Sequence, residues 1–309
     1  MRTVPAVTGL TCLTLLLLTA AFIADRAFQQ AGAWALLGLS LTVGFAHGAL
    51  DAAVMQRRFT NRLVLVKWLA AYLAAVVLLG WLLSSAINVA LWALILMSIW
   101  HFGEPYGRWN GLQSGSAHLT RAVVGGAPIM LPVWLAPEEL ASTLAPVVDT
   151  VAIEVWHAMA SIWLALWVVW LVVCGVPRMK ASRFAWAELA GCALAYAALS
   201  PLMAFALYFG LYHAPVHIWR VARSALAGGA VRLNDVATAA VGLVATLGAT
   251  WALGAGLWWL LSPDFSAMPE MAAALRWLIV ALAAVTAPHL VLISVSAAWL
   301  ARGPADTTA

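Results

Sequence analysis

The chain has 309 residues, of which 65% are hydrophobic and only 9% are charged, whereas an ordinary soluble domain carries about 25% charged residues. This composition excludes a disordered chain, a nucleic-acid-binding protein and a conventional soluble enzyme. The net charge of +4 is then best explained by basic loops on one side of a membrane. The three cysteines lie in apolar stretches without CxxC spacing, so neither a disulfide framework nor a zinc site is expected.

A membrane-spanning helix needs about 20 apolar residues, and about ten segments of the chain meet that requirement. In chain order the expected spans are residues 6–24, 31–54, 63–83, 86–103, 119–136, 154–175, 184–200, 202–222, 236–261 and 272–299. The first segment also resembles a secretory signal peptide, because Arg2 precedes an apolar stretch that ends in small residues. Its length favours a retained helix, and the fold class is therefore an all-α, polytopic transmembrane helix bundle.

Two boundaries between spans are tight. Residues 63–103 are interrupted only near Ser84-Ser85, and residues 184–222 only at Ser200-Pro201. Pro201 can begin a helix but cannot continue one, which predicts a turn there. Within the fifth span a glycine pair and two prolines predict a helix that is kinked or partly unwound.

The basic residues predict the orientation of the bundle. With ten spans and an internal N-terminus, fourteen of the sixteen basic residues fall on the inner side, and only Arg26 and Arg276 fall outside. Positive charges concentrate on the cytoplasmic side of membrane proteins. Both termini are therefore expected in the cytoplasm, and residues 1–309 are expected to form a single integral-membrane domain.

Five of the seven histidines are expected at one depth in the membrane. They lie in spans 2, 4, 8 and 10, about 12 to 18 residues from the outer end of each span: His47, His101, His213, His217 and His289. One intramembrane histidine is commonly a hydrogen-bond partner between helices, but five in one layer favour a metal or cofactor site. His118 and His157 are expected to be ordinary interface residues near span ends.

Spacing within the spans adds to this hypothesis. His213 and His217 are four residues apart, which places two imidazoles on one helix face, and Pro215 between them loosens the helix. Asp51 follows His47 by four residues and Glu104 follows His101 by three. These carboxylates can orient imidazoles and offset the charge of a metal. The alternative is that they pair with basic residues near the inner interface, Asp51 with Arg57 and Glu104 with Arg108.

The residues alone leave the metal open. Imidazole suits zinc, copper, iron and nickel. Neutral histidines without a thiolate leave a dicationic centre with open positions, which suits non-haem iron(II) and dioxygen.

Four motifs occur in order across most of the chain. They are His47-Gly48-Ala49-Leu50-Asp51, Trp100-His101-Phe102-Gly103-Glu104, Tyr208-Phe209-Gly210-Leu211-Tyr212-His213 with His217, and Ala287-Pro288-His289. Together they resemble the Brp/Blh (bacteriorhodopsin-related protein) family, the membrane-integral β-carotene 15,15′-dioxygenases of bacteria and archaea. The resemblance implies an Fe(2+) site and cleavage of the central double bond of β-carotene by dioxygen to give retinal. The implied ligands are His47, His101, His213 and His217.

The resemblance also implies the surroundings of that site. Asp51, Glu104 and His289 are expected beside the metal but outside its ligands. We also expect six aromatic side chains to line the site for the polyene. The alternative is that they serve only ordinary packing between helices. They are Trp100, Phe102, Phe205, Tyr208, Phe209 and Tyr212. The expected partners are a carotenoid, dioxygen and the lipid of the bacterial inner membrane, with a functional link to a rhodopsin that takes up retinal. The chain has only two lysines, both at inner loops, so it is not itself a rhodopsin.

Three other classes of protein fit parts of the pattern. A di-iron membrane desaturase or hydroxylase usually has about eight histidines in HxxxH and HxxHH clusters, whereas this chain has a single HxxxH. A bis-histidine haem protein for electron transfer would show a Soret band. A transporter fits the buried carboxylates but does not need several histidines in one layer.

Overall fold

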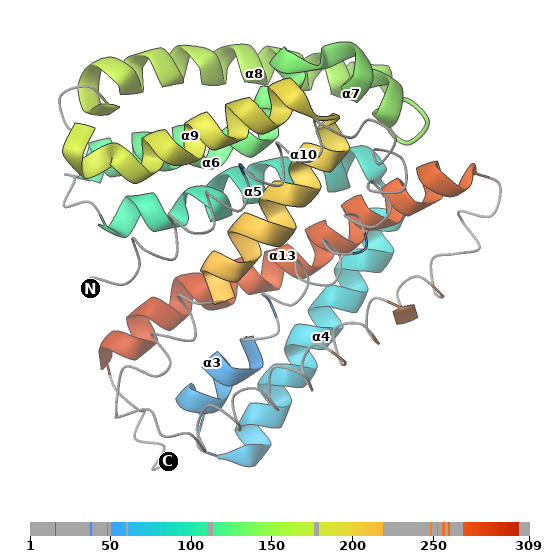
Figure 1. Ribbon diagram of the computed structural model, residues 1–309. Coiled ribbons are helices and arrows are strands. Elements are labelled where there is room, and N and C mark those ends of the chain that lie inside the picture. Colours follow the sequence, from blue (N-terminus) through green and yellow to red (C-terminus); the bar gives the residue numbers. More distant parts are fainter. Residues whose placement is uncertain are drawn as a thin grey trace. The chain divides into compact units, whose positions relative to one another are not determined.

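The computed structural model describes residues 51–59, 61–109, 114–175, 179–218 and 268–302, with a few single residues elsewhere. These ranges contain helices and no strand (Figure 1). In chain order the helices are α3 (Asp51–Arg58), α4 (Arg62–Ser84), α5 (Ile87–Trp109), α6 (Ser114–Leu135), α7 (Pro137–Leu144), α8 (Thr150–Trp170), η4 (Leu171–Gly175), α9 (Met179–Ala198), α10 (Pro201–Leu207), η5 (Tyr208–His213) and α13 (Glu270–Arg302). The all-α fold class is thereby confirmed for this part of the chain.

Six expected spans fall within the described ranges, a seventh, 202–222, is described as far as residue 218, and each corresponds to helix. Four helices there are long and apolar enough to cross a membrane: α4, α5 as far as Glu104, α8 with η4, and α13. A fifth span is possible if α6 and α7, which meet at 98°, are counted together. Expected spans 6–24 and 236–261, and most of 31–54, lie outside the described residues, so the ten-span count and the orientation stay predictions.

The described residues form two compact units, each built from two separate stretches of the chain. The first unit takes its residues from Met1–Leu41 and Ile95–Val216, and the second from Thr42–Leu94 and His217–Ala309. Helix α5 and the helix over residues 201–218 each begin in one unit and end in the other.

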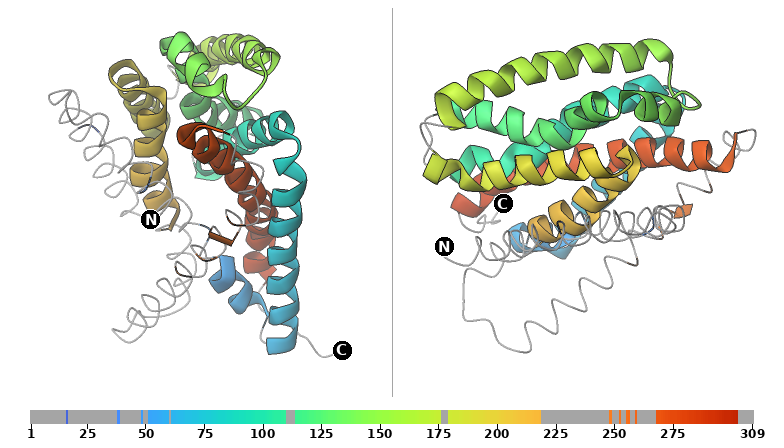
Figure 2. Two further views of the ribbon diagram at one scale, coloured as in Figure 1. Left: turned by 90° about the vertical axis from the view of Figure 1, so that its right-hand side faces the viewer. Right: turned by 45° about the horizontal axis from the view of Figure 1, so that its top comes forward.

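In the first unit, α6 packs against both α8 and α9 (Figure 2, right). Two buried indole groups of α8 bind it to α6. Trp163 Nε1 donates to the carbonyl oxygen of Val123 at 3.0 Å, and Trp170 Nε1 donates to Thr120 Oγ1 at 2.9 Å. A tryptophan buried in an apolar environment needs such a partner for its N–H. The two bonds therefore set the position of α8 along α6.

The prolines of α6 do not unwind it. The helix is continuous through Pro128 and Pro132, and the sharp bend comes only after Leu135. Pro132 has no N–H to donate to the carbonyl of Pro128. The hydroxyl of Tyr196 on α9 donates to that carbonyl oxygen instead, at 2.6 Å. A neighbouring helix thus supplies the hydrogen bond that the proline removes.

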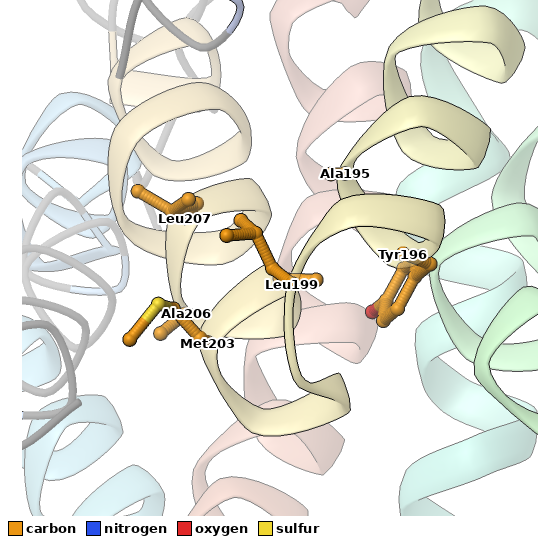
Figure 3. Close-up of a cluster of buried hydrophobic side chains, with 7 residues drawn as sticks. Ala195, Tyr196, Leu199, Met203, Ala206 and Leu207 are labelled. Carbon is orange, nitrogen blue, oxygen red and sulfur yellow. The ribbon is translucent and has the colours of Figure 1, made fainter. Parts of the chain in front are cut away.

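The predicted turn between α9 and α10 is confirmed. Helix α9 ends at Ala198, α10 begins at Pro201, and the Ser200 hydroxyl accepts a bond from the backbone N–H of Met203 at 3.4 Å. Apolar side chains on both sides of the turn form one buried cluster, which Figure 3 shows. Its members are Ala195, Tyr196, Leu199, Met203, Ala204, Ala206 and Leu207. This cluster fixes α10 against α9.

In the second unit, α4 and α13 run antiparallel and side by side (Figure 1, Figure 2). Arg276 near the start of α13 donates to the carbonyl oxygen of Ser84, the last residue of α4, at 2.7 Å. Towards the opposite ends, Leu292 of α13 packs with Val54 and Met55 of α3, against the first turns of α4. Helix α3 therefore lies across the start of α4 and the second half of α13.

The outer surface of α4 is apolar. Its exposed large hydrophobic residues are Leu63, Val66, Trp68, Leu73, Val77, Leu78, Trp81 and Leu82. Apolar side chains on the surface of a long helix are stable in contact with lipid but unfavourable in water. This surface supports a membrane location for the chain.

Candidate metal centre

A group of three buried histidines lies on α5 and on the helix that continues η5. The rings of His101 and His213, both in the first unit, have centroids 4.9 Å apart and planes inclined at 72°. His217 lies one turn beyond His213 on the same uninterrupted helix. One ring nitrogen from each of the three histidines lies within 4.8 Å of the others. Buried nitrogen donors at that spacing fit a single metal ion.

The helix changes its hydrogen-bond pattern where it carries these residues. Residues Tyr208–His213 form a π-helical segment, and the N–H of Ala214 donates to the carbonyl of Phe209, five residues earlier. A π-helical segment commonly marks a functional site in a helix. Pro215 directly follows the segment, and its missing N–H was the sequence signal for a loosened helix. The predicted loosening therefore takes the form of one π-helical segment.

Aromatic rings surround His213. Its ring lies 4.5 Å from the ring of Phe102 and stacks within 10° on Phe209, at 6.1 Å between centroids. Phe102 also contacts Tyr208 edge to face at 5.3 Å, and Phe205 stacks on Phe209 at 5.6 Å. All of these rings except that of Phe205 are buried, so apolar surface encloses the imidazole.

Trp100 takes a different position from these residues. Its side chain is 46% exposed, and the guanidinium carbon of Arg121 lies 3.5 Å from the centroid of its ring. Arg121 Nε also donates to the carbonyl oxygen of Trp100 at 2.9 Å. The exposed ring of Trp100 also stacks with the ring of His118, at 6.4 Å between centroids. The structure thus places Trp100 in a cation–π contact, and its role in lining the substrate site stays a prediction.

Glu188, a buried carboxylate on α9, was not predicted from the sequence. Its two oxygens accept hydrogen bonds from the hydroxyls of Tyr208 and Tyr212, each at 2.8 Å. A cavity of about 250 Å³ adjoins these three residues and is otherwise lined by apolar side chains. A single acidic residue inside an apolar span was the available signal, because such residues are costly in a membrane and commonly functional.

In the second unit, Asp51 joins two other helices through its carboxylate. Its oxygens lie 2.9 Å from Nδ1 of His289 on α13, and Oδ2 accepts a bond from the Tyr72 hydroxyl on α4 at 2.7 Å. Asp51 and His289 are buried. The side chain of Arg57, the alternative partner from the sequence, lies outside the described part of the chain, so that pairing is not tested. The rings of His289 and His217 lie 5.2 Å apart, inclined at 65°.

The remaining predicted residues are less informative. His47 lies outside the described residues, so its place among the ligands stays a prediction. Glu104 is half-buried, one turn after His101. His118 and His157 are exposed, and His157 contacts the ring of Trp134 at 5.6 Å. These exposed positions suit interface residues.

Comparison with known proteins decides the family. The family model described as Beta-carotene 15,15'-dioxygenase matches residues 38–296. The chain belongs to this family. It is also 24% identical, over 274 residues, to a protein of the uncultured marine bacterium 66A03 named Beta-carotene 15,15'-dioxygenase; the match covers 84% of this chain and 92% of that protein. No solved structure matches the chain. The predicted resemblance and the predicted enzyme class, a carotenoid-cleaving dioxygenase, are confirmed.

Proposed function

We propose that the protein is an iron(II)-dependent β-carotene 15,15′-dioxygenase of the bacterial inner membrane. The observation that carries the proposal is the buried group of His101, His213 and His217 in a chain of this family. In the proposed reaction the central double bond of β-carotene breaks and each of its two carbons takes one oxygen atom of dioxygen. One β-carotene and one O₂ therefore give two molecules of retinal, without another oxidant.

The donor set fits a non-haem iron. Neutral imidazoles are ligands for iron, and no thiolate is in the group. We propose His47 as the fourth ligand, from the motif that precedes α3. Bound iron(II) would supply the activation of dioxygen for attack on a carbon–carbon double bond. Three or four protein ligands leave coordination positions open for that role.

The surrounding residues would bind and shield the polyene. Phe102, Tyr208 and Phe209 enclose His213 in apolar surface, which excludes water and offers ring faces to a conjugated chain. The neighbouring cavity has room for an apolar group larger than benzene, which an engineered cavity of about 150 Å³ binds. Glu188 holds Tyr208 and Tyr212 by their hydroxyls, and so fixes two rings beside the histidine.

The substrate and product belong to the lipid phase. β-Carotene is wholly apolar, so an intramembrane site can receive it laterally from the bilayer without passage through water. The apolar outer surface of α4 is consistent with a protein immersed in lipid. We propose that the retinal released there passes to a rhodopsin, because this chain's two lysines, Lys67 and Lys180, lie in the first two turns of α4 and α9 and not in the middle of a span.

Expression in a β-carotene-producing bacterium tests the proposal. Loss of orange colour with appearance of retinal by chromatography is the expected result, and His213→Ala should abolish it. His157→Ala is the matched control, because that exposed imidazole lies on α8. Unchanged carotene with an iron-loaded wild-type protein would refute the proposal. An optical spectrum of the same preparation should lack a Soret band, which a haem protein would show.

A further inference from the structure

We propose that His289 is a further ligand of the metal, and that Asp51 and Tyr72 select the ring nitrogen with which it binds. This inference rests on the metal site of the proposed function. It changes the expectation from the sequence, which placed His289 beside the metal but outside its ligands. The three residues come from three helices, α13, α3 and α4, and all lie in the second unit.

The contact of its ring with Asp51 places the proton on His289. Nδ1 lies 2.9 Å from both oxygens of Asp51, and an ionised carboxylate only accepts hydrogen bonds. Nδ1 must therefore carry the proton and donate it to Asp51. In the neutral ring the lone pair is then on Nε2, which is the form of imidazole that binds metals.

Tyr72 holds Asp51 from the side of α4. Its hydroxyl donates to Asp51 Oδ2 at 2.7 Å, the usual length of an O–H···O hydrogen bond. This bond fixes the direction of the Asp51 carboxylate. Ligating histidines commonly donate their second nitrogen to a carboxylate that is itself hydrogen-bonded. Tyr72, Asp51 and His289 reproduce that arrangement.

His217, which belongs to the group of three histidines, lies next to His289. Its ring lies 5.2 Å from that of His289, close to the 4.9 Å between His101 and His213 within the group. The interplanar angles, 65° and 72°, are also similar. Two imidazoles that bind one ion at about 2 Å have ring centroids about 5 Å apart. His289 and His217 are thus placed to share one ion.

Metal binding of purified full-length protein tests the inference. Iron content and the titration of apoprotein with Co²⁺, followed by its visible absorption, are measured for His289→Ala, Asp51→Asn and Tyr72→Phe. The control is Tyr196→Phe, which also removes a buried hydroxyl bond, but one to a backbone carbonyl in α6. We expect His289→Ala to alter the Co²⁺ spectrum and lose most iron, and added imidazole to restore both.

Asp51→Asn should weaken Co²⁺ binding by about 10–100-fold, because its amide can donate to Nδ1 and favour the wrong tautomer. Tyr72→Phe should weaken it by up to about tenfold, and Tyr196→Phe should not change it. Wild-type iron content and Co²⁺ spectrum in His289→Ala would overturn the inference alone. The inference would also be overturned if imidazole restored neither iron nor the Co²⁺ spectrum in His289→Ala and Asp51→Asn bound Co²⁺ with wild-type affinity. A wild-type protein that binds no metal would overturn the proposed function as well.

Discussion

Substitution of Gly125 by alanine tests whether close packing of α5 on α6 positions His101. Gly125 of α6 faces Gly103 of α5, and a Cβ added at Gly125 would lie 2.8 Å from the Cα of Gly103. It would also lie against the backbone carbonyl oxygen of Ile99. These neighbours are backbone atoms, so no side chain can move aside to make room. The absence of a Cβ at this position is what permits the approach of the two helices.

The size of the effect follows from the displacement that an alanine requires. An ordinary contact needs about 3.4–4 Å, so α5 must move away from α6 by roughly 1 Å, at a cost of about 1–3 kcal/mol of unfolding free energy. His101 lies two residues before Gly103 on the same helix. A misplacement of about 1 Å at a catalytic centre can lower the rate about 10²-fold. Gly125→Ala should therefore destabilise the protein and nearly abolish retinal formation.

Gly248→Ala is the matched control, because that helical glycine is exposed and a Cβ added there meets nothing within 4 Å. It should leave stability unchanged or raise it by about 0.5–1 kcal/mol, since alanine favours the helix. Thermal unfolding in detergent and retinal formation are measured for both variants. Equal unfolding temperatures and equal activities would refute the idea that this glycine contact positions His101.

Three further predictions concern topology, the metal and Glu188. A C-terminal reporter should be active only on the cytoplasmic side, and activity outside would refute the positive-inside assignment. His213→Ala should empty the iron site while His157→Ala keeps wild-type iron by elemental analysis; equal loss would remove His213 from the ligands. Glu188→Gln should cost about 1–3 kcal/mol of unfolding free energy, because two bonds to a charged acceptor weaken. Tyr212→Phe should lower the free energy of unfolding by less in the Glu188→Gln variant than in the wild type. Additive effects of the two substitutions would refute a coupling between Glu188 and Tyr212.

The helices of the described ranges could be predicted from the sequence because membrane spans leave a strong local signal. Apolar stretches of the right length and the breaks at Ser84-Ser85 and Ser200-Pro201 located them. Helix α7 was not expected, because its eight residues are too few for a span. The bend before it also escaped prediction, since the prolines of α6 lie earlier and their helix continues through them.

The site could be predicted only as far as local spacing reaches. The pair His213 and His217 follows from helix geometry, whereas His101 was expected beside them only from its depth in the membrane and from the family resemblance; the structure brings the three together. The partners of Glu188 and Asp51 lie on other helices, 20 to 238 residues away in the sequence. A single sequence does not indicate which helices are neighbours, so these hydrogen bonds could be found only in the structure. The same reason explains why Tyr72 was missed.

The π-helical segment at Tyr208–His213 has a consequence for aligning distant relatives. A π-helical turn accommodates one residue more than an α-helical turn, so the helix before it and the helix after it are out of register. Deleting one residue in this segment would restore a continuous α-helix and leave the faces of the helix before and after it nearly unchanged, because the π-helical turn already absorbs that residue. Relatives with a single-residue gap here can therefore keep both the contacts of α10 and the His213–His217 spacing. Alignments that move this gap by a few positions would pair aromatic residues that are not structurally equivalent.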